Sequence, residues 1–168
     1  MHTVAPTTVQ EWLDAASAVS PTQCYGSMFS INVRELTPEV VDVISSHAEN
    51  MPNDPPTIFG IHELRPCPAT AGYPDSVFPL RIPHFMFEIF PAVETTDRVE
   101  AARQWAQNFY DALRKTDSGN LLPGTYLPFA PWESMNAREN FLEGYDTLAE
   151  LKREYDPANV FRYALARV

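Results

Sequence analysis

The residues best suited to chemistry lie in one short stretch, His84 to Phe90, which reads His-Phe-Met-Phe-Glu-Ile-Phe. Side chains alternate between the two faces of a strand, so this stretch would have one hydrophobic face and one mixed face. The mixed face carries His84, Met86, Glu88 and Phe90. A carboxylate and an imidazole on an otherwise apolar surface predict an acid/base pair that faces a buried ligand. The alternative is a sheet edge on which Glu88 is solvated and His84 is bonded to a backbone group.

Composition limits the classes of partner. The chain has 168 residues, which favours a single domain with a sizeable core. Its net charge is −10 and its Lys and Arg residues form no cluster, so we expect neither nucleic acid nor an anionic membrane surface as a partner. The first residues lack the features of a signal peptide and no apolar run has the length of a membrane span, so we expect a cytoplasmic protein. The two cysteines, Cys24 and Cys67, have no metal-ligand spacing and predict no metal site.

The stretch 84–90 belongs to an alternation of helices and strands. Hydrophobic periodicity predicts strands at 26–34, 57–64, 84–90 and 125–129, with helices at 37–49 and 95–115 between them. Further helices are expected at 7–19 and at 136–155, the latter with a break at Gly144. The resulting order is βαββαβ with one extra helix at each end. It predicts the ferredoxin-like α+β fold, an antiparallel sheet with its helices on one face.

We expect one structural unit over residues 1–168. It would comprise a helical extension (1–22), the βαββαβ core (23–135) and a C-terminal helix with its tail (136–168). Because helices cover only one face of such a sheet, the other face must meet solvent, a second chain or another domain. An uncovered apolar face favours self-association, so we expect a homodimer through this face.

The C-terminal stretch contains a specific motif, Leu151-Lys-Arg-Glu followed by Tyr155-Asp-Pro-Ala-Asn-Val-Phe-Arg162. It resembles the tail of the berberine-bridge-enzyme-like FAD-linked oxidases. Two further segments are similar to motifs of that family, the Trp-containing stretch 102–110 and Phe78-Pro-Leu-Arg81. Together these matches extend from about residue 27 to the end of the chain.

The resemblance implies the family's substrate domain, whose open sheet face lies over a flavin held by a separate domain. The sequence has no Gly-rich phosphate-binding segment, so we expect no cofactor of its own; the alternative is FAD supplied by a separate domain or subunit. Glu88 falls at or next to the family's general-base position, and Arg81 matches the arginine of its Phe-Pro-His-Arg motif. Leu80 replaces the histidine of that motif. Pro128 and Phe129 replace an asparagine and a tyrosine that the family places near the flavin and the substrate.

These departures favour a flavin-free enzyme that acts on a hydrophobic, polyketide-like or aromatic metabolite. Proton abstraction beside a carbonyl, followed by cyclisation, isomerisation or dehydration, suits a carboxylate in an apolar cleft. One alternative is a substrate-binding domain, a fragment or a split subunit of an FAD-linked oxidoreductase, which meets its flavin on a separate domain or docks on a flavoprotein. Another is a non-catalytic binding or dimerisation module. We predict three catalytic residues, Glu88, His84 and Tyr126. We predict five substrate-binding residues, Asn32, Arg34, His62, Met86 and Arg81.

Overall fold

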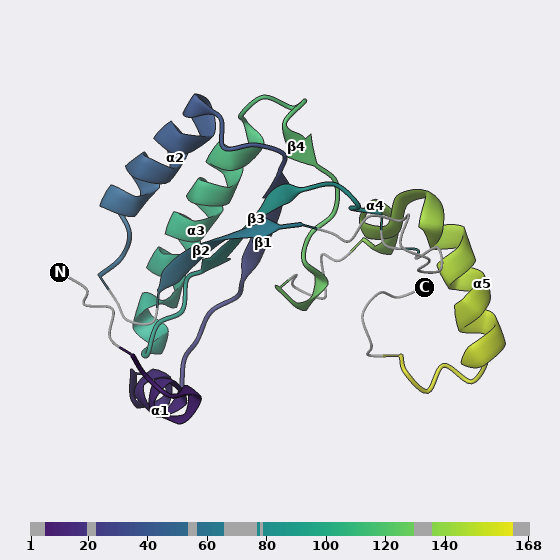
Figure 1. Ribbon diagram of the computed structural model, residues 1–168, viewed down its shortest axis with the longest axis horizontal. Helices are drawn as coiled ribbons and strands as arrows, with labels where there is room; N and C mark the ends of the chain where they lie inside the picture. The colour runs from purple at the N-terminus through teal and green to yellow at the C-terminus, as the bar shows by residue number, and fades with distance from the viewer. Residues whose placement is uncertain are drawn as a thin grey trace.

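The computed structural model describes residues 6–19, 23–53, 57–65, 77, 79–129 and 136–162 (Figure 1). The described strands are β1 (Phe29–Val33), β2 (Ile58–Leu64), β3 (His84–Phe90) and β4 (Leu121–Leu122). The described α-helices are α1 (Val9–Val19), α2 (Pro38–Glu49), α3 (Val99–Arg114), α4 (Ala137–Phe141) and α5 (Tyr145–Tyr155). Short 3-10 helices are η2 (Thr96–Arg98), η3 (Leu127–Phe129) and η4 (Leu142–Gly144).

The described strands form one antiparallel sheet in the order β2-β3-β1-β4. β3 is inserted between β1 and β2, which is the split βαβ arrangement. The register runs from Phe29↔Ile89 to Val33↔Phe85 between β1 and β3, and β2 pairs with the whole of β3. The predicted α+β class and antiparallel sheet are confirmed. β3, the strand that carries Glu88, is fixed by a neighbour on each side.

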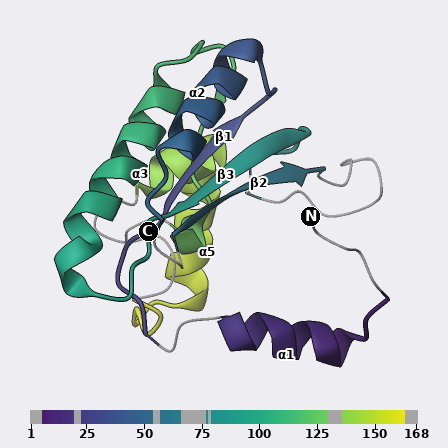
Figure 2. The ribbon, with the colours of Figure 1, turned by 90° about the vertical axis from the view of Figure 1, so that its left-hand side faces the viewer.

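α2 and α3 lie side by side on one face of this sheet (Figures 1 and 2). α2 begins where the sequence predicts, because Thr37 Oγ1 accepts the Val40 N–H and Pro38 takes the first helical position. The hydrophobic face of β3 points toward these helices, and Phe87 and Ile89 are completely buried there. The buried core cluster joins two residues from each of β1 and β3 to α2 and α3: Ile31, Val33, Val40, Phe87, Ile89, Trp105, Ala106, Phe109 and Leu113.

The fourth strand differs from the prediction. The sequence pattern favours 125–129, whereas β4 lies at Leu121–Leu122 and pairs with the end of β1. Pro123 has no N–H for a ladder and Gly124 has a φ of +78°, so the chain turns away from β1 directly after β4. The residues predicted as a strand instead contribute one turn of 3-10 helix, η3.

Two helical parts stand away from the sheet and its two covering helices. α1 is separate from the sheet in both views, and the side chains of Val9, Trp12 and Leu13 are exposed (Figures 1 and 2). α4, η4 and α5 form a second helical group (Figure 1). The break predicted near Gly144 is confirmed, because α4 gives way to η4 at Leu142, whose φ is +48°.

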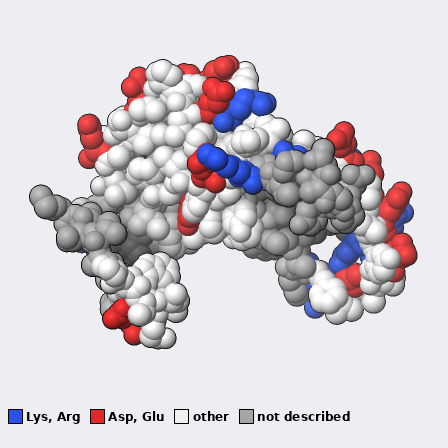
Figure 3. All heavy atoms as spheres, viewed as in Figure 1, with Lys and Arg blue, Asp and Glu red and all other residues white. Residues whose placement is uncertain are grey.

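The charged surface is mainly acidic, as the sequence total of 22 acidic and 12 basic residues requires. On the face shown in Figure 3, the basic side chains lie in small groups beside acidic ones. None of the described helices has the length and hydrophobicity needed to span a membrane.

Candidate functional site

The sheet face turned away from α2 and α3 carries the candidate site, and we call it the open face. Side chains from alternate positions of three strands share it. They are Ser30 and Asn32 of β1, Ile58, Gly60, His62 and Leu64 of β2, and His84, Met86, Glu88 and Phe90 of β3. The register places Ser30, Glu88 and Gly60 directly opposite one another across the three strands. We call these three residues the Glu88 row.

Glu88 is bonded to His62. Nε2 of His62 lies 3.0 Å from Oε2 of Glu88. His62 faces Met86 in the register, so its ring reaches Glu88 along a diagonal of the sheet. With the carboxylate ionised, Nε2–H is the donor, and Oε1 of Glu88 remains available to a ligand. The side chains of Glu88 and His62 are 17% and 46% exposed, so the pair can be reached from outside the chain.

His84 is not close to Glu88, although both lie on the open face. It precedes Glu88 by four residues on the same strand, which is about 13 Å at the usual rise per residue. The residue is 4% exposed, and its Nδ1–H donates to the carbonyl oxygen of Ile82 at 2.8 Å. This is the backbone-bonded alternative for His84, and the imidazole beside Glu88 belongs to His62 instead.

Asn32 and Met86 lie next to the Glu88 row and are almost completely buried. Nδ2 of Asn32 donates to the carbonyl oxygen of Gly124 at 3.2 Å, which ties the chain after β4 to the sheet. Met86 lies between Asn32 and His62 in the register. Both side chains therefore form the floor beside the pair rather than its accessible surface.

Arg34 and Arg81 lie at the end of the sheet that carries His84. Arg34 follows β1 and Arg81 precedes β3, and both are exposed. The described contacts bring neither guanidinium to Glu88. Of the predicted substrate-binding residues, His62 is thus the one that the structure joins to the predicted base.

Tyr126 approaches the Glu88 row from the β1 side, opposite His62. Its backbone N–H donates to Oγ of Ser30 at 2.9 Å, and Oγ1 of Thr125 donates to the Ser30 carbonyl oxygen at 3.1 Å. The Tyr126 ring packs against Phe129, with ring centroids 4.8 Å apart, and the residue is 44% exposed. Glu88 therefore has His62 on its β2 side and the Tyr126 segment on its β1 side.

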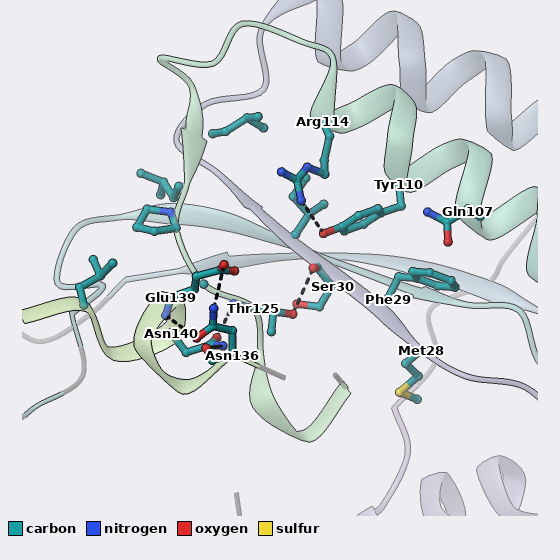
Figure 4. Close-up of a pocket in the computed structure, with 16 residues that line it drawn as sticks. Met28, Phe29, Ser30, Gln107, Tyr110, Arg114, Thr125, Asn136, Glu139 and Asn140 are labelled. Atoms are coloured by element: carbon teal, nitrogen blue, oxygen red, sulfur yellow. Dashed lines mark hydrogen bonds between the residues drawn. The ribbon is translucent and has the colours of Figure 1, made fainter. Parts of the chain in front are cut away.

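A cavity of about 570 Å³ lies along the outer edge of β1 (Figure 4). None of the predicted site residues lines it. Its polar groups largely bind one another: Asn140 accepts the Thr125 N–H at 2.7 Å and donates to the Asn136 carbonyl oxygen at 2.8 Å. Arg114 donates to the Tyr110 hydroxyl, and this bond above all raises the pKa of Arg114. The Asn140 bond joins α4 to the segment after β4, and the Arg114 bond lies within α3. These polar groups are occupied by one another, so we take the His62–Glu88 pair as the candidate site.

The sequence alone does not single out two members of the Glu88 row, Ser30 and Gly60. A glycine inside a β-rich segment is unusual and often marks a close approach of other groups, which is a signal for Gly60. Ser30 has no such signal, because its place opposite Glu88 depends on the strand register. Among the described residues, no group of three His, Cys, Asp or Glu side chains could hold a metal ion.

The tail motif builds a turn after α5. The carboxylate of Asp156 accepts the N–H groups of Val160 and Phe161 at 2.7 and 3.1 Å, and it also accepts a bond from Nζ of Lys152. The Lys152 bond is the main reason why the pKa of Asp156 is lowered. Asn159 has a φ of +50°, which asparagine tolerates better than most residues. The Tyr-Asp-Pro-x-Asn sequence is thus explained by the turn that it forms.

Comparison with known proteins agrees with the tail motif. Residues 131–166, which include α4, α5 and the turn, match the family described as "Berberine and berberine like". Over all 168 residues the chain is 25% identical to the FAD-linked oxidoreductase aurO of Gibberella zeae, of which it covers 32%. The chain therefore spans about a third of the length of this curated relative. The resemblance predicted from the sequence is confirmed: this chain is similar to the berberine-like region of FAD-linked oxidoreductases.

Proposed function

We propose that this chain is the substrate-facing part of an FAD-linked oxidoreductase, with Glu88 as its general base. The observation that carries the proposal is the His62–Glu88 bond, 3.0 Å long, at the middle of the open face. The similarity to an FAD-linked oxidoreductase over the whole chain supports the enzyme class. In this proposal the flavin-bearing part of the enzyme docks over the open face, and the ligand lies between the two.

The chemistry assigned to the chain's own residues is proton transfer. Oε1 of Glu88 takes a proton from the ligand while His62 holds Oε2, and the hydroxyl of Tyr126 donates to the ligand oxygen on which charge develops. Ile58 is 50% exposed beside the pair, and Phe90 lies next to it on β3. These apolar neighbours favour a hydrophobic metabolite whose acidic proton is on a hydroxyl group or beside a carbonyl.

The described residues do not fit the diphosphate of FAD. Dinucleotide phosphates are commonly bound at a helix N-terminus, where free N–H groups and the helix dipole favour negative charge. Each described α-helix instead has an acidic side chain in its first turn: Glu11, Glu39, Glu100, Glu139 and Asp146. Our proposal therefore places the flavin on another part of the enzyme, and we derive no step through it.

The same acidic helix starts favour a second candidate, a flavin-free acid/base enzyme. Here the His62–Glu88 pair acts alone on a polyketide-like or aromatic metabolite and catalyses cyclisation, isomerisation or dehydration. A second copy of the chain, rather than a flavoprotein, would then cover the open face. Size-exclusion chromatography of the purified chain would give a dimer in this case.

The two candidates differ in what the purified chain carries and binds. Neither candidate predicts flavin on this chain alone. A purified chain that is a monomer without a bound metabolite would support the first candidate, whereas a dimer that retains a metabolite would support the second. In both, Glu88→Gln should weaken the binding of phenol and β-diketone probes about tenfold, or ~1.4 kcal/mol, because a charged hydrogen-bond acceptor is lost.

The matched control is Glu63→Gln. Glu63 lies on β2, the strand that carries His62. It is exposed and pairs with Arg65 rather than with His62. This variant removes the same charge and should leave probe affinity unchanged. Equal probe affinity in the wild type and in Glu88→Gln, measured by calorimetry, would contradict the assignment of Glu88 as the base.

A further inference from the structure

Gly60 lies directly opposite Glu88, and the His62–Glu88 bond passes over it. A Cβ atom at residue 60 would lie 3.2 Å from Nε2 of His62 and 3.6 Å from Oε2 of Glu88. These are the two atoms that form the bond of the pair. A side chain at residue 60 would therefore contact both the imidazole and the carboxylate at the point where they meet.

The backbone of β2 does not require a glycine at this position. The φ angle of Gly60 lies outside the left-handed region that favours glycine, unlike those of Gly26 and Gly124. Glycine is unfavourable inside a strand, because it costs backbone entropy and has no side chain to pack. A β-branched residue would suit the strand better. The reason for a glycine must therefore come from its neighbours on the open face.

The diagonal geometry of the pair supplies that reason. His62 and Gly60 are two positions apart on the same strand and share a face, whereas Glu88 faces Gly60 and not His62. Diagonal neighbours are further apart than directly opposite ones, so the His62 ring must lean over residue 60 to reach the carboxylate. A side chain at residue 60 would stand in the path of the ring.

We propose that Gly60 is a positioning residue, which holds His62 against Glu88 by leaving the corner between them empty. His62 in turn fixes Oε2 of Glu88, so that Oε1 is presented to the ligand. The inference rests on the proposed function for its role in catalysis. The contact itself does not depend on a flavin or on a ligand, and it can be tested in the chain alone.

The test is the Gly60→Val variant, with the ring signals of His62 followed by NMR at one fixed pH. The chain has 4 histidines, so the His62 signals can be assigned from a His62→Gln variant. Glu88→Gln gives the reference position of a His62 ring without its carboxylate partner. We expect Gly60→Val to move the His62 signals to that reference position, and Gly60→Ala to move them part of the way.

Further measurements distinguish a positioning role of Gly60 from a general loss of structure in the variant. The signals of His47 and His84 should stay in place, and the melting temperature should not fall, because valine favours the strand. Ile61→Val introduces the same residue one position along, on the other face of β2, and should leave the His62 signals unchanged.

The inference is overturned if Gly60→Val leaves the His62 signals at their wild-type position, or if it moves the three histidines alike. It is also overturned if Glu88→Gln itself does not affect His62. Failure of the proposed function gives a different result. In that case the His62 ring signals still move in Gly60→Val and in Glu88→Gln, but Glu88→Gln does not change probe binding.

Discussion

Asp156 is the residue on which the end of the described chain depends. Its carboxylate binds Lys152 and two backbone N–H groups, and its pKa is lowered mainly by the Lys152 bond. A lowered folded-state pKa means that the stabilisation is fully present above the unfolded carboxyl pKa of about 3.9 and is lost as the pH falls through the folded value. We expect the amide protons of Val160 and Phe161 to lose protection from exchange as the pH falls below about 4.

The Asp156→Asn variant should show low protection of these amides at every pH, since it cannot form the charged bond to Lys152. Asp146→Asn is the control, because Asp146 pairs with Arg138 and does not contact the turn. Protection of Val160 and Phe161 that is independent of pH in the wild type would show that the carboxylate does not hold the turn.

Residue types and strand periodicity were sufficient to find Glu88 and to place it on the less hydrophobic face of β3. They were not sufficient to find its partner. His62 is 26 positions away in the sequence, and its meeting with Glu88 depends on the register between β2 and β3 and on the space above Gly60. His84 is nearer in sequence and shares the face of Glu88, yet the rise of a strand separates the two.

At the scale of elements, α3 is held to the sheet through Phe109. Its ring contacts those of His47, Phe59, Phe87 and Trp105, and the residue is completely buried. We expect Phe109→Ala to lower the free energy of unfolding by about 3–5 kcal/mol, because it leaves a cavity between α2, α3 and the sheet. Urea denaturation followed by circular dichroism measures this loss.

Phe161→Ala removes the same number of atoms from a side chain that is 68% exposed. Its effect on the free energy of unfolding should stay within about 0.5 kcal/mol, as for other surface substitutions. Similar losses in the two phenylalanine variants would contradict the division between core and tail.

Elements with a strong local signal agree with the sequence prediction, and the short ones do not. Period-2 alternation locates β3, and the Thr37-Pro38 cap locates the start of α2. β4 has only two residues, Leu121 and Leu122, and so shows no periodicity. Its pairing depends on Asn120, whose side chain accepts the Glu35 N–H and donates to the Glu35 carbonyl oxygen. These two bonds align β4 with the end of β1.

At the scale of the whole molecule, α1 is outside the core. Trp12 is 61% exposed, whereas Trp105 is 8% exposed and donates its indole N–H to the His47 carbonyl oxygen at 3.1 Å. We expect Trp12→Ala to change the free energy of unfolding by less than about 1 kcal/mol and Trp105→Ala to lower it by about 3–5 kcal/mol. Thermal denaturation of both variants tests this contrast. A large loss in Trp12→Ala would mean that α1 packs against the chain in solution.

The hydrogen bonds around Ser30 connect α4 to the surroundings of Glu88. Asn140 of α4 binds Thr125, Thr125 and Tyr126 bind Ser30, and Ser30 lies opposite Glu88. A substitution in α4 can therefore shift the wall beside Glu88 while the strands stay intact. An engineer, or natural variation, could adjust which ligands the open face accepts by altering this outer helix and leaving the reactive pair untouched.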